Sequence, residues 1–247
     1  MLTDRQDAYG HLLLAHLEHG GGYEIIERED GYFDISSGPD PYFAPFKDWP
    51  ESQRHALVYA QGRVLDIGAG AGRVSLELQT RGHEVLAIDN SPLAIEVCRQ
   101  RGVREAVVSP ITRLSRRFGK FDTIIMFGNN FGLFGNLRRA RWLLRRFHAM
   151  TGPQACILAE SNDPHRTENP FHLAYQESNR QRGRLPGQIK IRVRFQKYKS
   201  PWFDYLLVSP DEMRSILVGT GWILETVFES KGSPYVAKIS KQPASGE

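Results

Sequence analysis

Hydrophobic positions near the start of the chain recur first at helical spacing and then in short runs. One apolar stripe consists of Ala8, Leu12, Leu13 and Leu17. This stripe predicts a helix over residues 3–18. Two runs rich in β-branched and aromatic residues, 23–27 and 32–35, flank the turn pair Asp30-Gly31 and predict a β-hairpin.

A stretch rich in proline and aromatic residues follows the hairpin. Its composition predicts a loop over residues 39–49. Asp48 followed by Pro50 and Glu51 is typical of a helix start, so a helix is expected from there to about Ala60.

From residue 63 onward, short apolar runs alternate with amphipathic segments. The runs predict strands over 63–67, 84–88, 104–108, 121–127 and 155–160. The amphipathic segments predict helices over 74–80, 91–101 and 137–150. Strands that alternate with helices in this way form a parallel sheet covered on both faces. The sequence therefore predicts a doubly wound, Rossmann-like α/β domain.

The alternation breaks after residue 160. Residues 161–187 are polar and show no clear period, whereas 188–196 and 202–208 predict an antiparallel hairpin inserted after the fifth strand. A helix is expected over 209–219, and two strands that would complete the sheet as an antiparallel pair over 222–228 and 235–240. The expected organisation is an N-terminal cap, a cofactor-binding core, an inserted cap and a C-terminal completion of the core, over 1–49, 50–160, 161–208 and 209–247.

Composition favours a globular protein over a membrane-spanning or secreted one. The 247 residues are 40% hydrophobic and 24% charged, with a net charge of +4, as is common in globular domains. No apolar run reaches membrane-spanning length, and the N-terminus lacks the pattern of a secretion signal. Two cysteines indicate neither a disulfide framework nor a metal cluster, so a cytoplasmic protein without a metal is expected.

The clearest chemical signal is the glycine-rich segment from Val64 to Gly72. It falls where a strand ends and a helix begins, a place where glycines let the backbone approach a ligand. Dinucleotide-binding folds also use such a turn, but here Arg73 replaces their third glycine. Asp66 precedes the first glycine by two residues, which suits a ligand with an ammonium group and a sulfonium better than a pyrophosphate. Asp89 ends the next strand, where a carboxylate can accept hydrogen bonds from ribose hydroxyls.

With these motifs the sequence resembles the class I S-adenosylmethionine-dependent methyltransferases. The resemblance covers about residues 50–160 and the final strand pair. It implies that the glycine segment wraps the methionine part of S-adenosylmethionine, that Asp89 holds the ribose, and that residues 121–129 close the site. The implied cofactor-binding residues are Asp66, Gly68, Ala69, Gly70, Gly72, Asp89, Asn90, Ile111, Thr112, Phe127, Gly128 and Asn129.

The sequence departs from the family pattern in the segment that is expected to bind the adenine ring. Many members place an acid just after the third strand to bind the adenine amino group. Here the segment reads Ser109-Pro110-Ile111-Thr112. Adenine is therefore expected to be held by apolar contact with Ile111 and by backbone groups.

Residues for substrate binding and catalysis are less sharply marked. Glu160 and His165 follow the fifth strand and could take a proton from a substrate, although a lone histidine in a polar loop is more often only solvated. The candidate substrate residues are Tyr42, Asn130 and Asn162. For Tyr42 the alternative is plain packing, and for the asparagines of the loop after residue 126 it is hydrogen bonding to their own backbone.

Methyl transfer from a sulfonium is an in-line displacement that needs alignment rather than a metal or a nucleophilic triad. The favoured function is methyl transfer to an oxygen or nitrogen of a small molecule. One alternative is RNA methylation, suggested by the arginine-rich segment 138–146 and by Lys190, Arg192 and Arg194. A non-catalytic nucleotide-binding domain and a dinucleotide oxidoreductase are the others. The inserted hairpin could also pair with a second copy in a homodimer.

Overall fold

The computed structural model describes residues 2–242, which separate into two compact units. The first unit comprises the residues up to Trp49, Leu65–Arg113 and Ile189–Tyr205. The second comprises Pro50–Val64, Leu114–Gln188 and the chain from Leu206 onward. The division by function into four segments cuts across these units and stays a prediction.

The first unit contains the glycine turn and the elements that follow it. Its α/β elements are β3 (Arg63–Ile67, begun in the second unit), α4 (Arg73–Thr80), β4 (Glu84–Asp89), α5 (Pro92–Gln100), β5 (Glu105–Val108) and the 3₁₀ turn η3 (Ile111–Arg113). The strands lie in the order β3-β4-β5, and β4 pairs with β5 in parallel. Five of the six residues of β4 are buried. Continuous burial of this kind is typical of a parallel strand covered on both faces, as the apolar run predicts.

The N-terminal segment of the first unit is more helical than predicted. Its elements are η1 (Asp4–Gln6), α1 (Ala8–His19), β1 (Ile25–Arg28), β2 (Phe33–Ile35), α2 (Asp40–Phe43) and η2 (Phe46–Asp48). The β1–β2 hairpin is confirmed. The helix predicted from residue 3 begins only at Ala8, because Asp7 caps it by accepting a hydrogen bond from the backbone N–H of Gly10 at 3.1 Å. The predicted loop over residues 39–49 is wrong, since two short helical turns fall within it.

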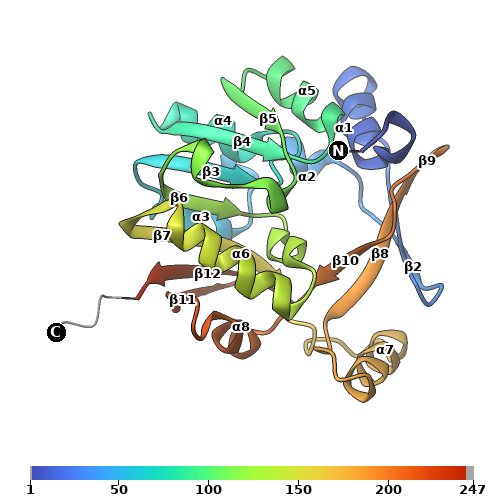
Figure 1. Ribbon diagram of the computed structural model, residues 1–247. Helices are drawn as coiled ribbons and strands as arrows, with labels where there is room; N and C mark the ends of the chain where they lie inside the picture. The colour runs from blue at the N-terminus through green and yellow to red at the C-terminus, as the bar shows by residue number, and fades with distance from the viewer. Residues whose placement is uncertain (1, 243–247) are drawn as a thin grey trace. The chain divides into compact units, whose positions relative to one another are not determined.

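The insertion after the fifth predicted strand joins the N-terminal hairpin in a second sheet. Strands β8 (Gln188–Phe195), β9 (Tyr198–Lys199) and β10 (Phe203–Leu206) belong to it, and its order is β10-β8-β1-β2 with β9 paired to β8. Figure 1 shows the orange strand β8 running alongside the blue N-terminal hairpin, with β1 between β8 and β2, although these segments are far apart in the sequence. Strand β8 therefore has a neighbour on each side, and the edges of this sheet are β2 and β10.

The second unit carries the other strands and most of the large helices. Its helices are α3 (Glu51–Leu57), α6 (Leu137–Ala149), α7 (Pro170–Gln181) and α8 (Pro210–Leu217), with 3₁₀ turns η4 (Arg116–Phe118) and η5 (Asn130–Phe134). Its strands are β6 (Phe121–Met126), β7 (Thr151–Asn162), β11 (Trp222–Glu229) and β12 (Pro234–Lys241). They lie in the order β11-β12-β7-β6, with β6 parallel to β7 and β12 antiparallel to both of its neighbours. The predicted antiparallel strand pair at the end of the chain is confirmed.

Two sequence-based expectations in this unit need correction. Asp48 does not begin helix α3, which starts at Glu51 with Pro50 in the capping position. Helix α7 was hidden in the polar stretch 161–187, because it buries only Tyr175, Gln176 and Asn179, two of which are polar amides, and leaves Phe171 exposed. A helix that buries amide side chains has no stripe of apolar residues, so hydrophobic periodicity in the sequence does not reveal it.

Among the described residues, no helix combines the length and the apolar character needed to cross a membrane.

Candidate cofactor site and its surroundings

The glycine turn after β3 adopts the backbone conformation that the sequence suggests. Gly68, Gly70 and Gly72 have φ angles of 72°, 56° and 78°, a left-handed region that side-chain-bearing residues rarely adopt. The backbone N–H groups of Gly68 and Ala69 both bond the carbonyl oxygen of Ile88, at 2.9 and 3.1 Å. A Cβ atom at Gly72 would lie 2.7 Å from Val103. The turn thus needs glycine both for its conformation and for the close packing behind it.

Asp66 lies inside β3 as a buried carboxylate and is only 2% exposed. Ser75 Oγ on α4 donates to Asp66 Oδ2 at 2.7 Å. Burial raises the pKa of Asp66 to about 6, an effect that the hydrogen bond from Ser75 and the charge of Arg73 oppose. A carboxylate held in this way gains from a nearby cation, because the opposite charge stabilises its ionised form.

Asp89 ends β4 beside the same turn. The backbone N–H of Gly70 donates to its Oδ2 at 3.1 Å, and that of Ser91 donates to its Oδ1 at 3.0 Å. Burial raises the pKa of Asp89 to about 6 as well, despite these hydrogen bonds. Each carboxylate oxygen has two lone pairs, so each retains one for a further donor. Two hydroxyl groups of a ribose fit that capacity.

The segment beyond β5 lacks the acid that many family members use to bind adenine, as its sequence indicates. Asn90 is exposed after β4, and Ile111 and Thr112 form the short turn η3. Ile111 is partly buried and Thr112 exposed, so an apolar side chain and a backbone turn occupy the place where many family members carry an acid. In the first unit, the residues present fit a sulfonium nucleoside: two buried carboxylates and a glycine turn, with no acid at the expected adenine position.

Tyr42, a predicted substrate residue, lies on α2 and meets a tyrosine that sequence reasoning missed. The rings of Tyr9 and Tyr42 meet edge to face, with centroids 5.3 Å apart. Tyr9 Oη lies 3.0 Å from the position that a Cβ on Gly70 would occupy. Tyr9 stands in an ordinary amphipathic helix pattern, so no signal in the sequence marked it.

Arginine–aromatic stacking links the N-terminal segment to α4 and α5 within the first unit. The stacked pairs are Arg73 over Trp49, Arg81 over Phe46 and Arg101 over Phe43, with guanidinium carbons 4.3–4.7 Å from the ring centroids. Each such pair stabilises by roughly 0.5–1 kcal/mol or more when shielded from water. The N-terminal segment is therefore fastened to the two helices that follow the glycine turn and Asp89.

The second unit holds the remaining predicted residues, beginning with the loop after β6. Phe127 is buried, while Gly128 and Asn129 both adopt left-handed conformations with φ near 68°. Glu160 on β7 supports this loop, because its Oε2 accepts a hydrogen bond from the backbone N–H of Gly128 at 2.7 Å. The same oxygen accepts from Gln53 Nε2 on α3, also at 2.7 Å. The geometry gives Glu160 two donors, of which the Gln53 amide is buried and the Gly128 N–H is not, and its role as a proton acceptor stays a prediction.

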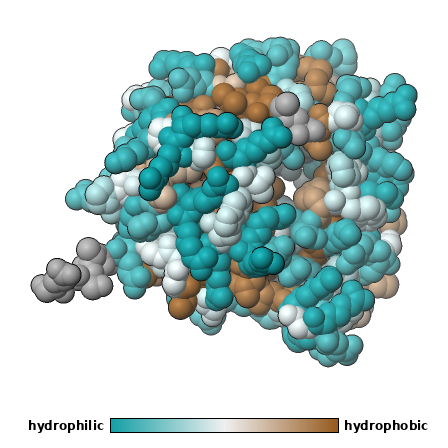
Figure 2. All heavy atoms as spheres, in the orientation of Figure 1, coloured by the Kyte–Doolittle hydropathy of each residue, from teal (hydrophilic) through white to brown (hydrophobic). Residues whose placement is uncertain are grey.

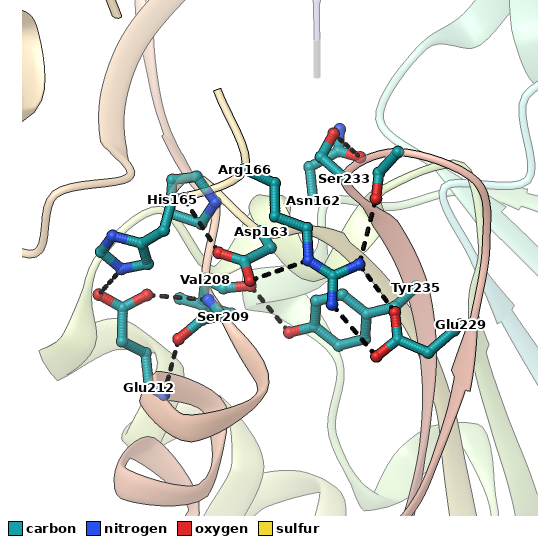
Figure 3. Close-up of polar contacts among 12 residues, drawn as sticks. Asn162, Asp163, His165, Arg166, Val208, Ser209, Glu212, Glu229, Ser233 and Tyr235 are labelled. Atoms are coloured by element: carbon teal, nitrogen blue, oxygen red, sulfur yellow. Dashed lines mark hydrogen bonds and ion pairs between the residues drawn. The ribbon is translucent and has the colours of Figure 1, made fainter. Parts of the chain in front are cut away.

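The structure places Asn162 and His165 in a polar network at the end of β7 (Figure 3). His165 Nε2 lies 3.3 Å from Glu212 Oε1, and the backbone N–H of His165 donates to Asp163 Oδ1 at 3.0 Å. Asn162 lies beside Ser233 at the turn between β11 and β12. Asn130 begins η5 and is only partly buried. His165 is thus exposed to solvent and also has a carboxylate neighbour in Glu212, and its role as a proton acceptor stays a prediction.

Arg166 ties that network to the C-terminal strand pair. Its guanidinium donates to Glu229 at 2.9 and 3.3 Å and to the carbonyl oxygen of Gly232 at 3.2 Å. Glu212 belongs to the network and also completes the capping box of α8 with Ser209, at the start of the helix that the sequence predicts from residue 209. These contacts order the loop after β7.

Most of the basic groups behind the RNA alternative have partners within the protein. On α6, Arg139, Arg141 and Arg145 donate to backbone carbonyl oxygens of η5 and of the end of α8. On β8, Arg192 makes a two-pronged ion pair with Glu27, with both distances 2.8 Å, and Arg194 lies 3.5 Å from the same carboxylate. Figure 2 shows hydrophilic side chains over the face where α6 lies in Figure 1. Much of this positive charge serves internal contacts.

No group of three or more metal-ligating side chains with the geometry of a metal site occurs between residues 2 and 242.

Comparison with known proteins identifies the domain type. A family model described as a methyltransferase domain matches residues 64–154. A curated protein of Staphylococcus carnosus, described as an uncharacterized methyltransferase, is 36% identical over 70 residues. That match covers 28% of this chain, which spans only about a third (34%) of the length of that relative.

Two solved structures resemble the chain over almost its whole length. A S-adenosylmethionine-dependent methyltransferase of Bacteroides fragilis, in complex with S-adenosyl-L-homocysteine, is 27% identical with a TM-score of 0.83, and the match covers 98% of this chain and 97% of that one. The CcbJ methyltransferase of Streptomyces caelestis has 13% identity and a TM-score of 0.63, over 96% and 98% of the two chains. The second likeness shows the fold alone. Together with the glycine turn and its two carboxylates, the first likeness and the family match show that residues 64–154 form a methyltransferase domain of the class I S-adenosylmethionine-dependent type.

Proposed function

We propose that this protein transfers the methyl group of S-adenosylmethionine to an oxygen or nitrogen of a small molecule. The observation that carries the proposal is the pair of buried carboxylates, Asp66 and Asp89, at the left-handed glycine turn of the first unit. The structure with bound S-adenosyl-L-homocysteine that resembles the chain over its whole length supports the same cofactor.

The chain's own residues have defined tasks in this proposal. Asp66 balances the positive charge of the methionine end, and the two open lone pairs of Asp89 accept the ribose hydroxyls. The glycine turn admits the cofactor close to the backbone, and Ile111 covers the adenine. When bound, S-adenosylmethionine supplies an activated methyl group, so the protein has mainly to align the reactants and exclude water.

The small-molecule acceptor is favoured over RNA by the same structure. The N-terminal segment is fastened onto α4 and α5 by three arginine–aromatic pairs, which suits a cap over a small ligand. Arg192 and Arg194, which suggested an RNA-binding face, share the single carboxylate of Glu27. Phosphate binding draws on positive charge, and Glu27 offsets one of these two charges.

Calorimetric titration with S-adenosylmethionine and S-adenosyl-L-homocysteine tests cofactor binding, and we expect both to bind. Incubation with methyl-labelled S-adenosylmethionine and a panel of amines, phenols, alcohols and carboxylic acids then tests transfer. An Asp89→Ala variant is expected to lose most of its affinity, whereas Asp34→Ala, an exposed acid of the hairpin, is the matched control. A wild-type protein that binds neither compound would refute the proposal.

A further inference from the structure

Tyr9, on helix α1, brings a phenol hydroxyl to the middle glycine of the turn and has no task in the proposed cofactor site. Its Oη lies 3.0 Å from the position that a Cβ on Gly70 would occupy, and its ring carbons Cε1 and Cζ lie 3.8 Å from that position. The backbone of Gly70 is engaged elsewhere, since its N–H donates to Asp89 and its carbonyl oxygen accepts from Cys98 Sγ at 3.2 Å. Tyr9 therefore covers the side of Gly70 on which a side chain would otherwise stand.

Helix α1 holds Tyr9 in this place, because the residues around it are fixed to the start of α5. Asp7 accepts hydrogen bonds from the N–H of Gly10 on α1, at 3.1 Å, and from the N–H of Leu93 on α5, at 3.0 Å. Gly10 packs so closely that a Cβ there would clash with Ser91 Oγ. All of these contacts lie within the first unit. The hydroxyl at the glycine turn is thus carried by an anchored helix and not by a loose terminus.

Tyr9 is accessible and keeps its proton at neutral pH. It is only partly buried, whereas Ala8 and Gly10 beside it are buried. Burial is the largest of the effects that raise the pKa of Tyr9 well above its usual value near 10. A phenol hydroxyl can accept one hydrogen bond and still donate another. Tyr9 can therefore donate to a bound ligand while a neighbour uses its lone pairs.

The groups of S-adenosylmethionine differ in what they need from such a donor. In the proposed site the ribose hydroxyls donate to Asp89 and the ammonium group donates to Asp66, while the sulfonium accepts no hydrogen bond. The α-carboxylate is the only anionic group of the cofactor, and the charges of Asp66 and Asp89 repel it. It needs donors of its own, and hydrogen bonds to a charged acceptor are stronger than those between neutral groups.

We infer that the Tyr9 hydroxyl donates a hydrogen bond to the α-carboxylate of S-adenosylmethionine, which makes α1 a part of the cofactor site. The inference rests on the proposed function and adds a binding residue to that site. Tyr9 and Asp66 then hold the two charged groups at the amino-acid end of the cofactor. A cofactor held at both groups presents its sulfonium, and the methyl group on it, in one orientation.

Two ligands separate a contact with the carboxylate from a merely structural role of Tyr9. Decarboxylated S-adenosylmethionine keeps the nucleoside, the sulfonium and the amine of S-adenosylmethionine and lacks only the carboxylate. Calorimetry at pH 7.5 measures the binding of both ligands to the wild type and to Tyr9→Phe, which keeps the ring that packs against Tyr42. Tyr23→Phe, at a tyrosine that is 57% exposed, is the matched control. Thermal unfolding verifies that both variants are folded.

We expect Tyr9→Phe to weaken the binding of S-adenosylmethionine by about tenfold, the loss typical of a hydrogen bond to a charged group. Its binding of the decarboxylated ligand should change less than about twofold, and Tyr23→Phe should bind both as the wild type does. An equal loss for both ligands, or no loss for either, would overturn the inference.

The wild type provides a test that does not depend on the variant. It should bind S-adenosylmethionine at least about tenfold more tightly than the decarboxylated ligand, since only the former offers Tyr9 its acceptor. A wild type that binds both equally well would overturn the inference and leave the proposed function standing. A wild type that binds neither ligand would overturn the proposed function, and this inference with it.

Discussion

Asp66 and Asp89, the carboxylates that we propose to bind the cofactor, are expected to lower the stability of the folded protein at neutral pH. Both are buried carboxylates, and burial raises the pKa of each to about 6. The folded protein therefore holds these protons more tightly than the unfolded chain, whose aspartates titrate near 3.9. The stability that these two residues give is present at low pH and is lost as the pH rises from about 4 to about 6.

Replacing Asp66 by asparagine is expected to raise the free energy of unfolding at pH 7.5 by roughly 1–3 kcal/mol, since a shift of one pKa unit corresponds to about 1.4 kcal/mol. Ser75 can still donate to the amide oxygen. Affinity for S-adenosyl-L-homocysteine should fall in the same variant. Urea unfolding and calorimetry measure the two effects, and Asp34→Asn should change neither. A D66N protein that is less stable yet binds as tightly as the wild type would contradict this assignment.

Glu160 provides a second test at the level of one residue. Glu160→Ala leaves Gln53 Nε2 and the N–H of Gly128 without their acceptor, so a loss of about 2–4 kcal/mol in unfolding free energy is expected. Glu160→Gln keeps an accepting oxygen and should lose less than about 1 kcal/mol. Urea unfolding compares the two with the exposed Glu177→Ala. Equal losses in both Glu160 variants would show that its charge, and not its geometry, supports the loop.

Among the elements, α1 depends on a side chain that caps two helices at once. Asp7 accepts from Gly10 on α1 and from Leu93 on α5. Asp7→Ala is expected to lower the unfolding free energy by about 1–3 kcal/mol and to loosen α1. Hydrogen exchange should then quicken over residues 8–19, while Asp34→Ala, at an exposed acid outside the helix, leaves that segment protected. Unchanged exchange in D7A would mean that packing alone holds the helix.

Elements with an apolar stripe or a clear cap were predictable, and others were not. Strands β3, β4 and β6 follow from their continuous apolar runs, and α8 from the Ser209–Glu212 capping box. Helix α7 could not be predicted from the sequence, because its buried face carries the amides Gln176 and Asn179. These amides donate to backbone carbonyl oxygens of Pro164, Pro186 and Gln188. Periodicity reports apolar burial only, so a face buried through hydrogen bonds is invisible to it.

For the whole molecule, the net charge of +4 is not by itself evidence of nucleic-acid binding. Arg192 and Arg194 pair with Glu27, and three arginines of α6 donate to backbone carbonyl oxygens. Single-stranded RNA is expected to bind no more tightly than about 10 µM at 0.15 M salt, the range of non-specific association. Fluorescence anisotropy over a salt series measures this. Binding that is much tighter, and steeply weakened by salt, would revive the RNA alternative.

The sequence by itself determined the parallel strands, the glycine turn and the two carboxylates beside it, because each of these depends on neighbours only a few residues away. Only the tertiary structure decided that β8 pairs with β1, that Glu160 holds the loop at Gly128, and that Tyr9 comes to the glycine turn. These contacts join segments far apart in the chain, where neither residue's immediate sequence records its partner. They form because folding brings buried polar groups together and each must find a hydrogen-bonding neighbour.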